Sequence, residues 1–410
     1  MNAVDTLYVS VTICQHGSTI NCQTIPYVQV DTQSYGLRII GAGVLSSTLY
    51  AELTPETGTN NAQLAECAQW ADGFSWGPMV TADIQIAGTG GGEAASDVPV
   101  QIIGASNYPA TVNEAQGTDG NTLPATCTDT GASGLEDTVA TFGANGIIGV
   151  GAFVQDCGDG CAGSGTPEPG AYYVCPTTTT CTAANVPVAQ QTSNPVAYFT
   201  TDNNGVIIEL PAIPAAGQSV VNGSLVFGIN TETNNQLGSA TVLPASPNYG
   251  TITTTFNGTA LDGSYFDTGS NGLFFNDSSD TSLTQCTSTD YSGFYCPAST
   301  LSFSATVEGC TSASAASFAC SAASTPTVNV DFSVANASTL DANGTFAAFN
   351  DLGGTVPAQP SGSPFNGTFD WGLPFFFGQN VFVAIACGAD DSGVSNCVNA
   401  DAPFYGLIAN

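Results

Sequence analysis

A short turn occurs twice in this chain of 410 residues, and no other feature limits the possible folds so strongly. Residues 30–37 read VDTQSYGL and residues 266–273 read FDTGSNGL. In both copies an apolar strand-like stretch runs into Asp-Thr, and Gly-Leu follows. The copies lie more than half the chain length apart, so they indicate two duplicated lobes rather than a solenoid, whose repeats are much shorter.

Composition favours strands and turns over helices. The chain has 47 Gly and only 8% charged residues, which suits short strands joined by turns. No amphipathic helical pattern of 10–15 residues with a good cap stands out. Because one core rarely serves so long a chain, we expect an all-β protein with two lobes, residues 1–200 and 201–410.

The order of expected elements repeats between the halves. Each half has a strand, an Asp-Thr turn, a stretch of hairpins and an apolar run beside glycine, NGIIGVG in the first and DWGLPFFFG in the second. The Cys-, Pro-, Thr- and Gly-rich segment 154–195 is predicted to be a long insertion or loop. Strands are predicted at 6–14, 25–30, 81–88, 98–104, 205–211, 223–229, 249–256 and 263–275, and an apolar run lies between glycines at 145–153.

Charge excludes two classes of partner. Arg38 and His16 are the only basic side chains against 33 Asp and Glu, giving a net charge of −32. Nucleic acid and anionic membrane surfaces need a basic footprint, which is lacking. The longest apolar stretch, 371–386, is too short and interrupted to span a bilayer. The first residues carry no cationic segment or cleavage site, so we expect any export signal to have been removed.

The 14 cysteines cluster in a way that predicts disulfides and a secreted, extracellular or periplasmic protein. A zinc site would need histidine or closely paired C-x-x-C ligands, so we expect no metal there. Two cysteines, Cys67 and Cys127, have no near neighbour. The simplest pairs close short loops: Cys14/Cys22, Cys157/Cys161, Cys175/Cys181, Cys286/Cys296, Cys310/Cys320 and Cys387/Cys397.

Asp31 and Asp267, one at each turn, are the candidate catalytic residues. If they meet between the lobes, the two carboxyls cannot both ionise cheaply, so one keeps a proton. One carboxylate can then act as a base on water while the other acts as an acid toward a carbonyl oxygen. The carboxyl pair of the aspartic proteases shares a proton in this way.

The chain resembles the pepsin-like aspartic proteases over almost its full length. The resemblance is carried by the stretches CQTIPYVQVDTQSYGLRI, GPMVTADIQIAG, NGIIGVG, GSLVFGI, FDTGSNGLFF and WGLPFFFG. It implies two duplicated β-barrel-like lobes with a cleft between them, a polypeptide substrate in that cleft and no cofactor. The combination ECAQWADGFSWGPMVTADIQI, DNNGVIIELP and FDWGLPFFFG also resembles an uncharacterised bacterial secreted family of unknown function.

The resemblance also implies roles for the residues around the two aspartates. Thr32 and Thr268 match threonines that hydrogen-bond across the lobes beneath the pair. Ser34 and Ser270 match hydroxyls that bond the outer carboxylate oxygens. Gly269 matches a glycine whose N–H faces a carboxylate.

Two positions depart from that pattern. Gln33 stands where the second turn has Gly269, and its side chain is placed to project into the cleft, although its backbone N–H survives. Trp70 takes the place of the tyrosine in the flap that covers the cleft in that family. Trp can still donate an N–H and cover a cleft.

Other motifs have structural explanations that we prefer. Arg38 is expected to pair with a surface carboxylate, and His16 to be exposed in a hairpin tip. Residues 156–161 and 202–205 could bind calcium through oxygen ligands, although tight turns explain them about as well. Six Asn-x-Ser/Thr sites could carry glycans in a eukaryotic secretory pathway.

Two functions remain open from the sequence. One is a secreted aspartic endopeptidase, favoured by Asp-Thr-Gly-Ser and both threonines. The other is an idle protein of the same fold that serves as an extracellular structural, self-assembling or binding module. Gln33, the unusual flap and the near absence of basic residues favour the second.

Overall fold

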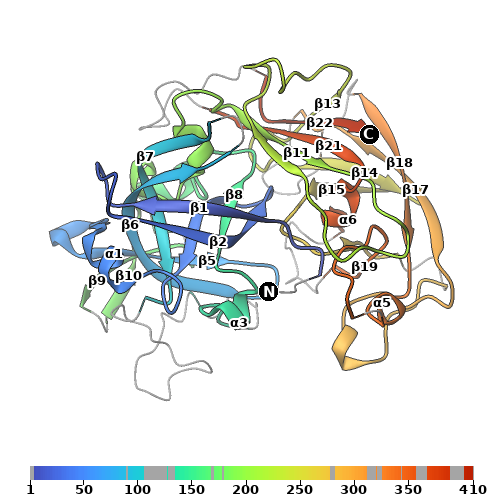
Figure 1. Ribbon diagram of the computed structural model, residues 1–410, viewed down its shortest axis with the longest axis horizontal. Helices are drawn as coiled ribbons and strands as arrows, with labels where there is room; N and C mark the ends of the chain where they lie inside the picture. Colours follow the sequence, from blue (N-terminus) through green and yellow to red (C-terminus); the bar gives the residue numbers. More distant parts are fainter. Residues whose placement is uncertain are drawn as a thin grey trace.

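Strands dominate the structure, a computed structural model in which the two halves of the chain lie side by side (Figure 1). The expected all-β class is therefore confirmed, with barrel-like sheets in place of long helices. The structure describes residues 4–88, 91–105, 127, 134–167, 170–177, 180–277, 282–311, 320, 326–342, 344–356, 367–387 and 401–409.

The first half forms a closed barrel with an extension. Strands run in the order β1-β2-β8-β3-β7-β6, and β1 also pairs with β6, which closes the ring. From β6 the sheet continues through β5 and β9 to β10, and β4 pairs with β6. The strands are β1 (Tyr8–Cys14), β2 (Cys22–Asp31), β3 (Tyr35–Ile40), β4 (Thr54–Pro55), β5 (Gln63–Gln69), β6 (Phe74–Ile86), β7 (Glu93–Ile103), β8 (Gly146–Val150), β9 (Tyr172–Thr177) and β10 (Thr180–Ala183).

The second half contains two sheets. One has the order β12-β11-β21-β22-β13 and the other β18-β17-β14-β15-β20-β16-β19. The strands are β11 (Gly205–Leu210), β12 (Ser224–Phe227), β13 (Thr241–Pro244), β14 (Ile252–Phe256), β15 (Thr259–Phe266), β16 (Leu273–Phe274), β17 (Leu301–Glu308), β18 (Thr327–Val334), β19 (Gly353–Gly354), β20 (Asp370–Trp371), β21 (Gln379–Ala384) and β22 (Phe404–Ala409).

Helices are short, and among the described residues none could cross a membrane. The longest, α1, begins after Ser46, whose side chain accepts a hydrogen bond from the Leu49 N–H. The α-helices are α1 (Ser47–Glu52), α3 (Val139–Phe142), α4 (Asp159–Ala162), α5 (Ala337–Leu340) and α6 (Leu373–Phe376). The 3₁₀ helices are η1 (Thr59–Asn61), η2 (Val188–Gln190), η3 (Pro195–Tyr198) and η4 (Thr289–Tyr291).

Both halves contain the same strand arrangement around the Asp-Thr turn. In the first, β8 lies between the strands flanking the turn, parallel to β2 and antiparallel to β3, with Gly149 opposite Asp31. In the second, β20 lies parallel to β15 and antiparallel to β16, with Trp371 opposite Phe266. A further parallel pairing follows in each half, β3 with β7 and β16 with β19. The repeated sequence thus corresponds to a repeated topology.

Glycine is required where the inserted strand passes the turn. A Cβ on Gly149 would lie 2.4 Å from the Tyr35 nitrogen, and one on Gly372 would lie 2.1 Å from the Gly272 oxygen. Neither position can carry a side chain without moving the backbone. This close approach explains why the apolar runs NGIIGVG and DWGLPFFFG both contain glycine.

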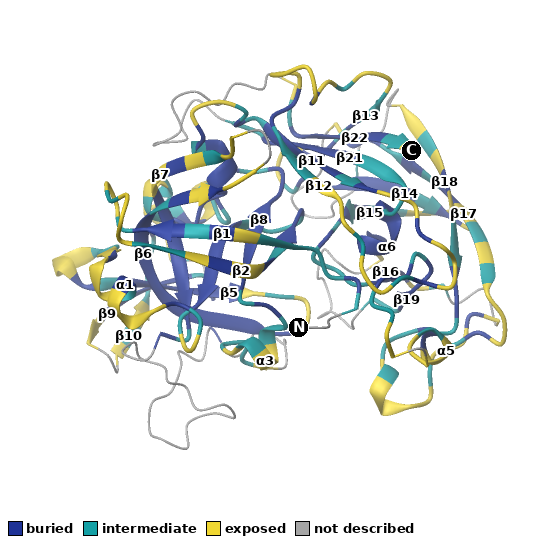
Figure 2. Cartoon of the chain, viewed as in Figure 1, coloured by how far each residue is buried: buried dark blue, intermediate teal, exposed yellow. Residues whose placement is uncertain are grey.

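Buried residues are concentrated in the strands, whereas exposed residues are found mainly in loops and outer hairpins (Figure 2). One cluster of buried apolar side chains runs through both halves. In the second half aromatic rings form much of the core, with Phe275 stacked on Phe369 at 4.7 Å between ring centroids. Burial of this apolar surface is the main force that holds the sheets together.

The disulfides follow the expected short loops. The pairs Cys14–Cys22, Cys157–Cys161, Cys175–Cys181, Cys286–Cys296 and Cys310–Cys320 are all formed. The two remaining cysteines, Cys67 and Cys127, also bond to each other. For the expected Cys387–Cys397 pair, Cys387 is disulfide-bonded and Cys397 lies outside the described residues.

Segment 154–195, expected to be a stapled insertion or loop, is stapled by Cys157–Cys161 and Cys175–Cys181 but also contains regular structure. Strand β9 lies within it and pairs with β5, and its residues Tyr172 and Tyr173 are fully buried. The strand was not predicted because its apolar stretch, YYVC, is too short to show alternation and is surrounded by Cys, Pro, Thr and Gly. The segment therefore extends the sheet of the first half at its β5 edge, through β9 and β10.

Candidate active site

The repeated topology brings Asp31 and Asp267 together. Asp31 is the last residue of β2, and Asp267 directly follows β15. Their carboxyls lie next to each other, since a Cβ on Gly269 would be 2.7 Å from Asp31 Cγ and 2.9 Å from Asp267 Oδ1, and they are close enough to share a hydrogen bond. Burial, followed by the negative charges of Asp31 and Asp370, raises the pKa of Asp267 well above its ordinary value. Such a pair keeps one proton between its two carboxyls.

Backbone N–H groups of the turns point at these carboxylates. The N–H groups of Gln33 and Ser34 donate to Asp31 Oδ1, at 2.7 and 3.1 Å. The Gly269 N–H donates to Asp267 Oδ1 at 2.7 Å. Gln33 therefore makes the same backbone contact as Gly269, because the contact needs an N–H and no particular side chain.

The two threonines connect the turns beneath the pair, as expected. Thr32 Oγ1 donates to the Phe266 oxygen at 2.9 Å, and Thr268 Oγ1 donates to the Val30 oxygen at 2.7 Å. Each hydroxyl also accepts the backbone N–H of the other threonine. Both threonines are fully buried, so this closed set of four hydrogen bonds fixes one turn against the other.

The two serines differ, which the sequence did not indicate. Ser270 Oγ donates to Asp267 Oδ2 at 2.9 Å. Ser34 Oγ is buried and has no hydrogen-bond partner within the described part of the chain. The expected hydroxyl contact to Asp31 is therefore not made, and the Ser34 backbone N–H takes its place.

Gln33 reaches toward the last strand of the second half. Its Oε1 lies 3.4 Å from the Tyr405 hydroxyl, which donates at 2.9 Å to the Gly250 oxygen. At the equivalent position a Cβ on Gly269 would lie only 2.7 Å from Asp31 Cγ. The two turns are thus not interchangeable: one has a side chain where the other has no room for it.

The sequence profile of one family matches residues 1–404, almost the entire chain. Its members are described as "Protein of unknown function (DUF3443)". The chain belongs to this family. The expected membership of a family of unknown function is confirmed, and the description itself carries no activity. No curated protein matches the chain.

Three tyrosines surround the aspartate pair in this family member, and sequence reasoning missed all of them. Tyr35 follows the first turn, Tyr265 precedes the second, and Tyr405 lies on β22. Burial is the largest cause that raises the pKa of each phenol, and the charges of Asp31 and Asp267 add to it. They remain neutral around the pair. From the sequence, only Tyr35 and Tyr265 could have been predicted to lie near the aspartates, because they stand beside the two turns.

A third carboxyl, Asp370, was also missed. It lies on β20, is buried, and its Oδ2 is 2.6 Å from Ser270 Oγ. Burial raises the pKa of Asp370 well above its ordinary value, the Ser270 hydrogen bond lowers it, and the Asp31 charge raises it. The signal in the sequence is an Asp inside an otherwise apolar run, FDWGLPFFF.

Trp70 lies at the tip of the β5–β6 hairpin. Its backbone N–H donates to the Gly73 oxygen at 2.8 Å, and its indole N–H donates to Ser75 Oγ at 3.2 Å. The Arg38 guanidinium carbon lies 5.3 Å from the centre of its ring. The hairpin tip thus packs on the strand that leaves the first turn, while a role for Trp70 as a flap stays a prediction.

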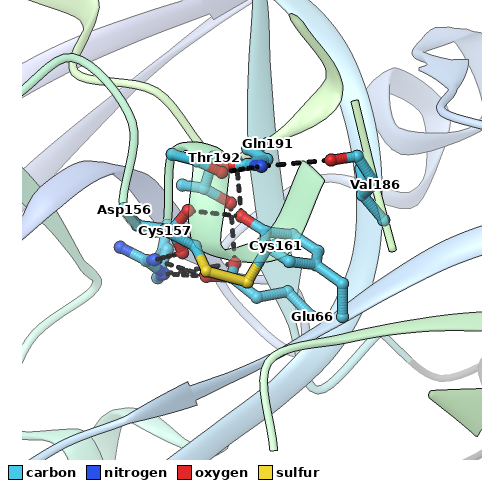
Figure 3. Close-up of a disulfide and its surroundings, with 10 residues drawn as sticks. Glu66, Asp156, Cys157, Cys161, Val186, Gln191 and Thr192 are labelled. Carbon is cyan, nitrogen blue, oxygen red and sulfur yellow. Dashed lines mark hydrogen bonds and ion pairs between the residues drawn. A yellow bond between two sulfur atoms is a disulfide. The ribbon is translucent and has the colours of Figure 1, made fainter. Parts of the chain in front are cut away.

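Arg38 does not pair with a surface carboxylate, so that expectation was wrong. Its side chain is only 3% exposed, and it binds Glu66 through Nε and Nη2 and Asp156 through Nη2 at 3.0 Å. Figure 3 shows the two partners, Glu66 and Asp156, beside the Cys157–Cys161 disulfide. Its Nη1 donates to the Tyr35 oxygen at 2.8 Å. Burial lowers the pKa of Arg38, but the Glu66 and Asp156 charges outweigh it and keep the pKa above its ordinary value.

His16 is half exposed in the β1–β2 hairpin tip, as expected, with Nδ1 2.9 Å from Asp83 Oδ1. The hydrogen bond to Asp83 is the main cause that raises its pKa. Across the described ranges, no group of three or more His, Cys, Asp or Glu side chains is placed to hold a metal ion. Asp156 and Asp202, from the two motifs considered for calcium, instead contact Arg38 and Thr231.

Proposed function

We propose that this protein is a secreted aspartic endopeptidase in which Asp31 and Asp267 activate water for peptide hydrolysis. The observation that carries the proposal is the hydrogen-bonded pair of carboxyls, each at the end of an equivalent strand in a duplicated topology. The resemblance to pepsin-like proteases gives the finer architecture, two lobes with a substrate cleft between them.

The chemistry follows from the shared proton. The ionised carboxyl takes a proton from a water molecule, and the water oxygen attacks the peptide carbonyl carbon. The protonated carboxyl donates to the carbonyl oxygen as it becomes a hydroxyl. The C–N bond then breaks as the carboxyl that took the proton from water gives it to the leaving nitrogen, while one hydroxyl of the tetrahedral carbon returns a proton to the other carboxylate. Backbone N–H groups at both turns hold the carboxylates in place, so the pair needs little rearrangement.

The disulfides support secretion. Six pairs are formed among the described cysteines, and such bonds persist in oxidising compartments, outside the cell or in the periplasm.

The test is cleavage of an unfolded protein at acid pH. We expect cleavage that a statine-type inhibitor stops and that Asp267→Asn abolishes, with melting temperature little changed. Asp290→Asn is the matched control, because Asp290 is exposed and lies in η4, outside both Asp-Thr turns. Cleavage that persists in the Asp267→Asn protein would contradict the assignment.

A second candidate is an idle protein of this fold that serves as an extracellular structural, self-assembling or binding module. The observation that favours it is Gln33, which places a side chain at the position where Gly269 has no room for one. This candidate expects no cleavage by the wild-type protein at any acid pH.

A further inference from the structure

The Ser270 hydroxyl contacts two carboxyls at once. Its Oγ lies 2.9 Å from Asp267 Oδ2 and 2.6 Å from Asp370 Oδ2, both within hydrogen-bonding distance. A hydroxyl has a single proton to donate, and an ionised carboxylate can only accept. Both contacts can therefore be hydrogen bonds only if one of the two carboxyls is protonated and donates to Ser270.

The surroundings identify which carboxyl holds that proton. Asp267 accepts the Gly269 N–H at 2.7 Å on its other oxygen. Asp370 is only 5% exposed, and its Oδ1 has no hydrogen-bond partner in the described part of the chain. A buried carboxylate with one oxygen unpartnered is a poor anion, because burying charge without hydrogen bonds is costly. Asp370 is therefore the neutral member.

The duplicated topology provides an internal comparison. Tyr265 on β15 is opposite Asp370, and the equivalent pairing in the first half places Ile147 opposite Gln29. Where Ile147 stands, no carboxyl can reach the serine, and Ser34 Oγ is left without a partner among the described residues. The serine hydroxyl is therefore oriented by a carboxyl only in the second half, where Asp370 stands at the position of Ile147.

We propose that Asp370 is a positioning residue of the active site. In its neutral form it donates to Ser270 Oγ, and Ser270 in turn donates to Asp267 Oδ2. The three carboxyls then hold two protons, one on Asp370 and one shared by Asp31 and Asp267, which leaves the single negative charge that the hydrolysis needs. The catalytic consequence rests on the proposed function, but the proton assignment does not.

Ionisation of Asp370 would reverse the direction of the chain of hydrogen bonds. Ser270 would then donate to the Asp370 anion, the nearer of its two partners, and Asp267 Oδ2 would lose its donor. Within the described part of the chain, the titratable groups that interact with Asp370 are Asp31, Asp267 and the Tyr265 phenol. The negative charge of the Asp31–Asp267 pair opposes the ionisation of Asp370. We therefore expect the hydrogen bonds to reverse only on the alkaline side of the pH profile of kcat.

Infrared difference spectroscopy tests the proton assignment without any need for activity. Spectra of the wild type and of Asp370→Ile, the residue of the first repeat, are compared at pH 7. We expect the variant to lose the carbonyl stretch of a protonated carboxylic acid. Loss of a carboxylate band would overturn the inference. Asp370→Asn provides the same comparison if the Ile protein does not fold.

Peptidase kinetics test the positioning role. Asn can donate permanently to Ser270, so Asp370→Asn should keep kcat within about threefold of wild type and move the alkaline limb to higher pH. Asp370→Ile should lower kcat about tenfold with KM unchanged, the effect of one hydrogen bond in the transition state. If kcat declines at the same alkaline pH in the wild type and in Asp370→Asn, the proposed reversal of the hydrogen bonds on ionisation of Asp370 is excluded. No cleavage by any form, with the expected infrared result, would count against the proposed function alone.

Discussion

Arg38→Met would remove the only Lys or Arg side chain from a cluster that also holds Glu66 and Asp156. Glu66 is 1% exposed and accepts from Arg38 through both of its oxygens. Thr192 Oγ1 also donates to Glu66, at 2.7 Å. Without Arg38, Glu66 must stay buried as an uncompensated anion or bind a proton, and both choices are costly at neutral pH.

The size of the effect follows from the proton count. A folded state that holds one proton more than the unfolded state loses about 1.4 kcal/mol of stability per pH unit. From about pH 4.5, where an exposed Glu titrates, to pH 7, this amounts to about 3 kcal/mol. Breaking a buried ion pair typically costs about 3–5 kcal/mol, which agrees. For 410 residues unfolding together, about 3 kcal/mol lowers the melting temperature by about 4 °C.

Thermal unfolding of the oxidised proteins at pH 7 and pH 4 measures this effect. We expect Arg38→Met to be clearly less stable than wild type at pH 7 and much closer to it at pH 4. The double variant Arg38→Met/Glu66→Gln should recover much of the loss, because it no longer buries an unpaired charge. Equal destabilisation at both pH values would refute the reasoning and assign the loss to packing.

Three further predictions concern the whole chain, Gln33 and one disulfide. The melting temperature should be higher near pH 4 than at pH 8 in low salt, and the gap should shrink in high salt. Burial raises the pKa of Asp351 to about 6 and that of Glu136 to about 8. The stability that their protonation gives is therefore lost as pH rises through these values. A melting temperature that falls steadily from pH 8 to pH 4 would contradict this prediction. Gln33→Gly should raise cleavage or statine-inhibitor affinity, and unchanged values in an active protein would show that the side chain is harmless. Replacing Cys67 and Cys127 by Ser opens a link across 60 positions and should cost about 4 kcal/mol in denaturant unfolding, while no change would show that the link does not constrain the unfolded chain.

Features that depend on local spacing could be predicted from the sequence. The two Asp-Thr turns and their glycine-flanked runs indicated a duplicated arrangement, and the strand pairing of β8 and β20 shows one. Short cysteine spacings predicted five of the disulfides, because a loop of a few residues leaves little choice of partner. The threonine contacts came from the resemblance, and the hydrogen bonds agree with it.

Features that depend on distant contacts could not be predicted. Arg38 appeared to be a surface residue because nothing near it in sequence is acidic, whereas Glu66 and Asp156 approach it from β5 and from the segment before α4. Strand β9 was missed because its partner β5 lies about a hundred residues earlier in the chain. Both predictions failed because the order of strands in the sheet, and not the local sequence, decides which residues come into contact.

Two departures from symmetry distinguish the turns. Gly269 has no room for a Cβ beside Asp31, whereas Gln33, its counterpart in the first turn, extends to the Tyr405 hydroxyl. Asp370 differs from Ile147, and it reaches Asp267 through Ser270. Asp31 and Asp267 each accept backbone N–H donation from their own turn, but within the described part of the chain only Asp267 also accepts a serine hydroxyl. A symmetric frame alone would make the two carboxyls equivalent, so the contact through Ser270 gives Asp267 its own environment and lets the two aspartates take different roles in the proposed hydrolysis.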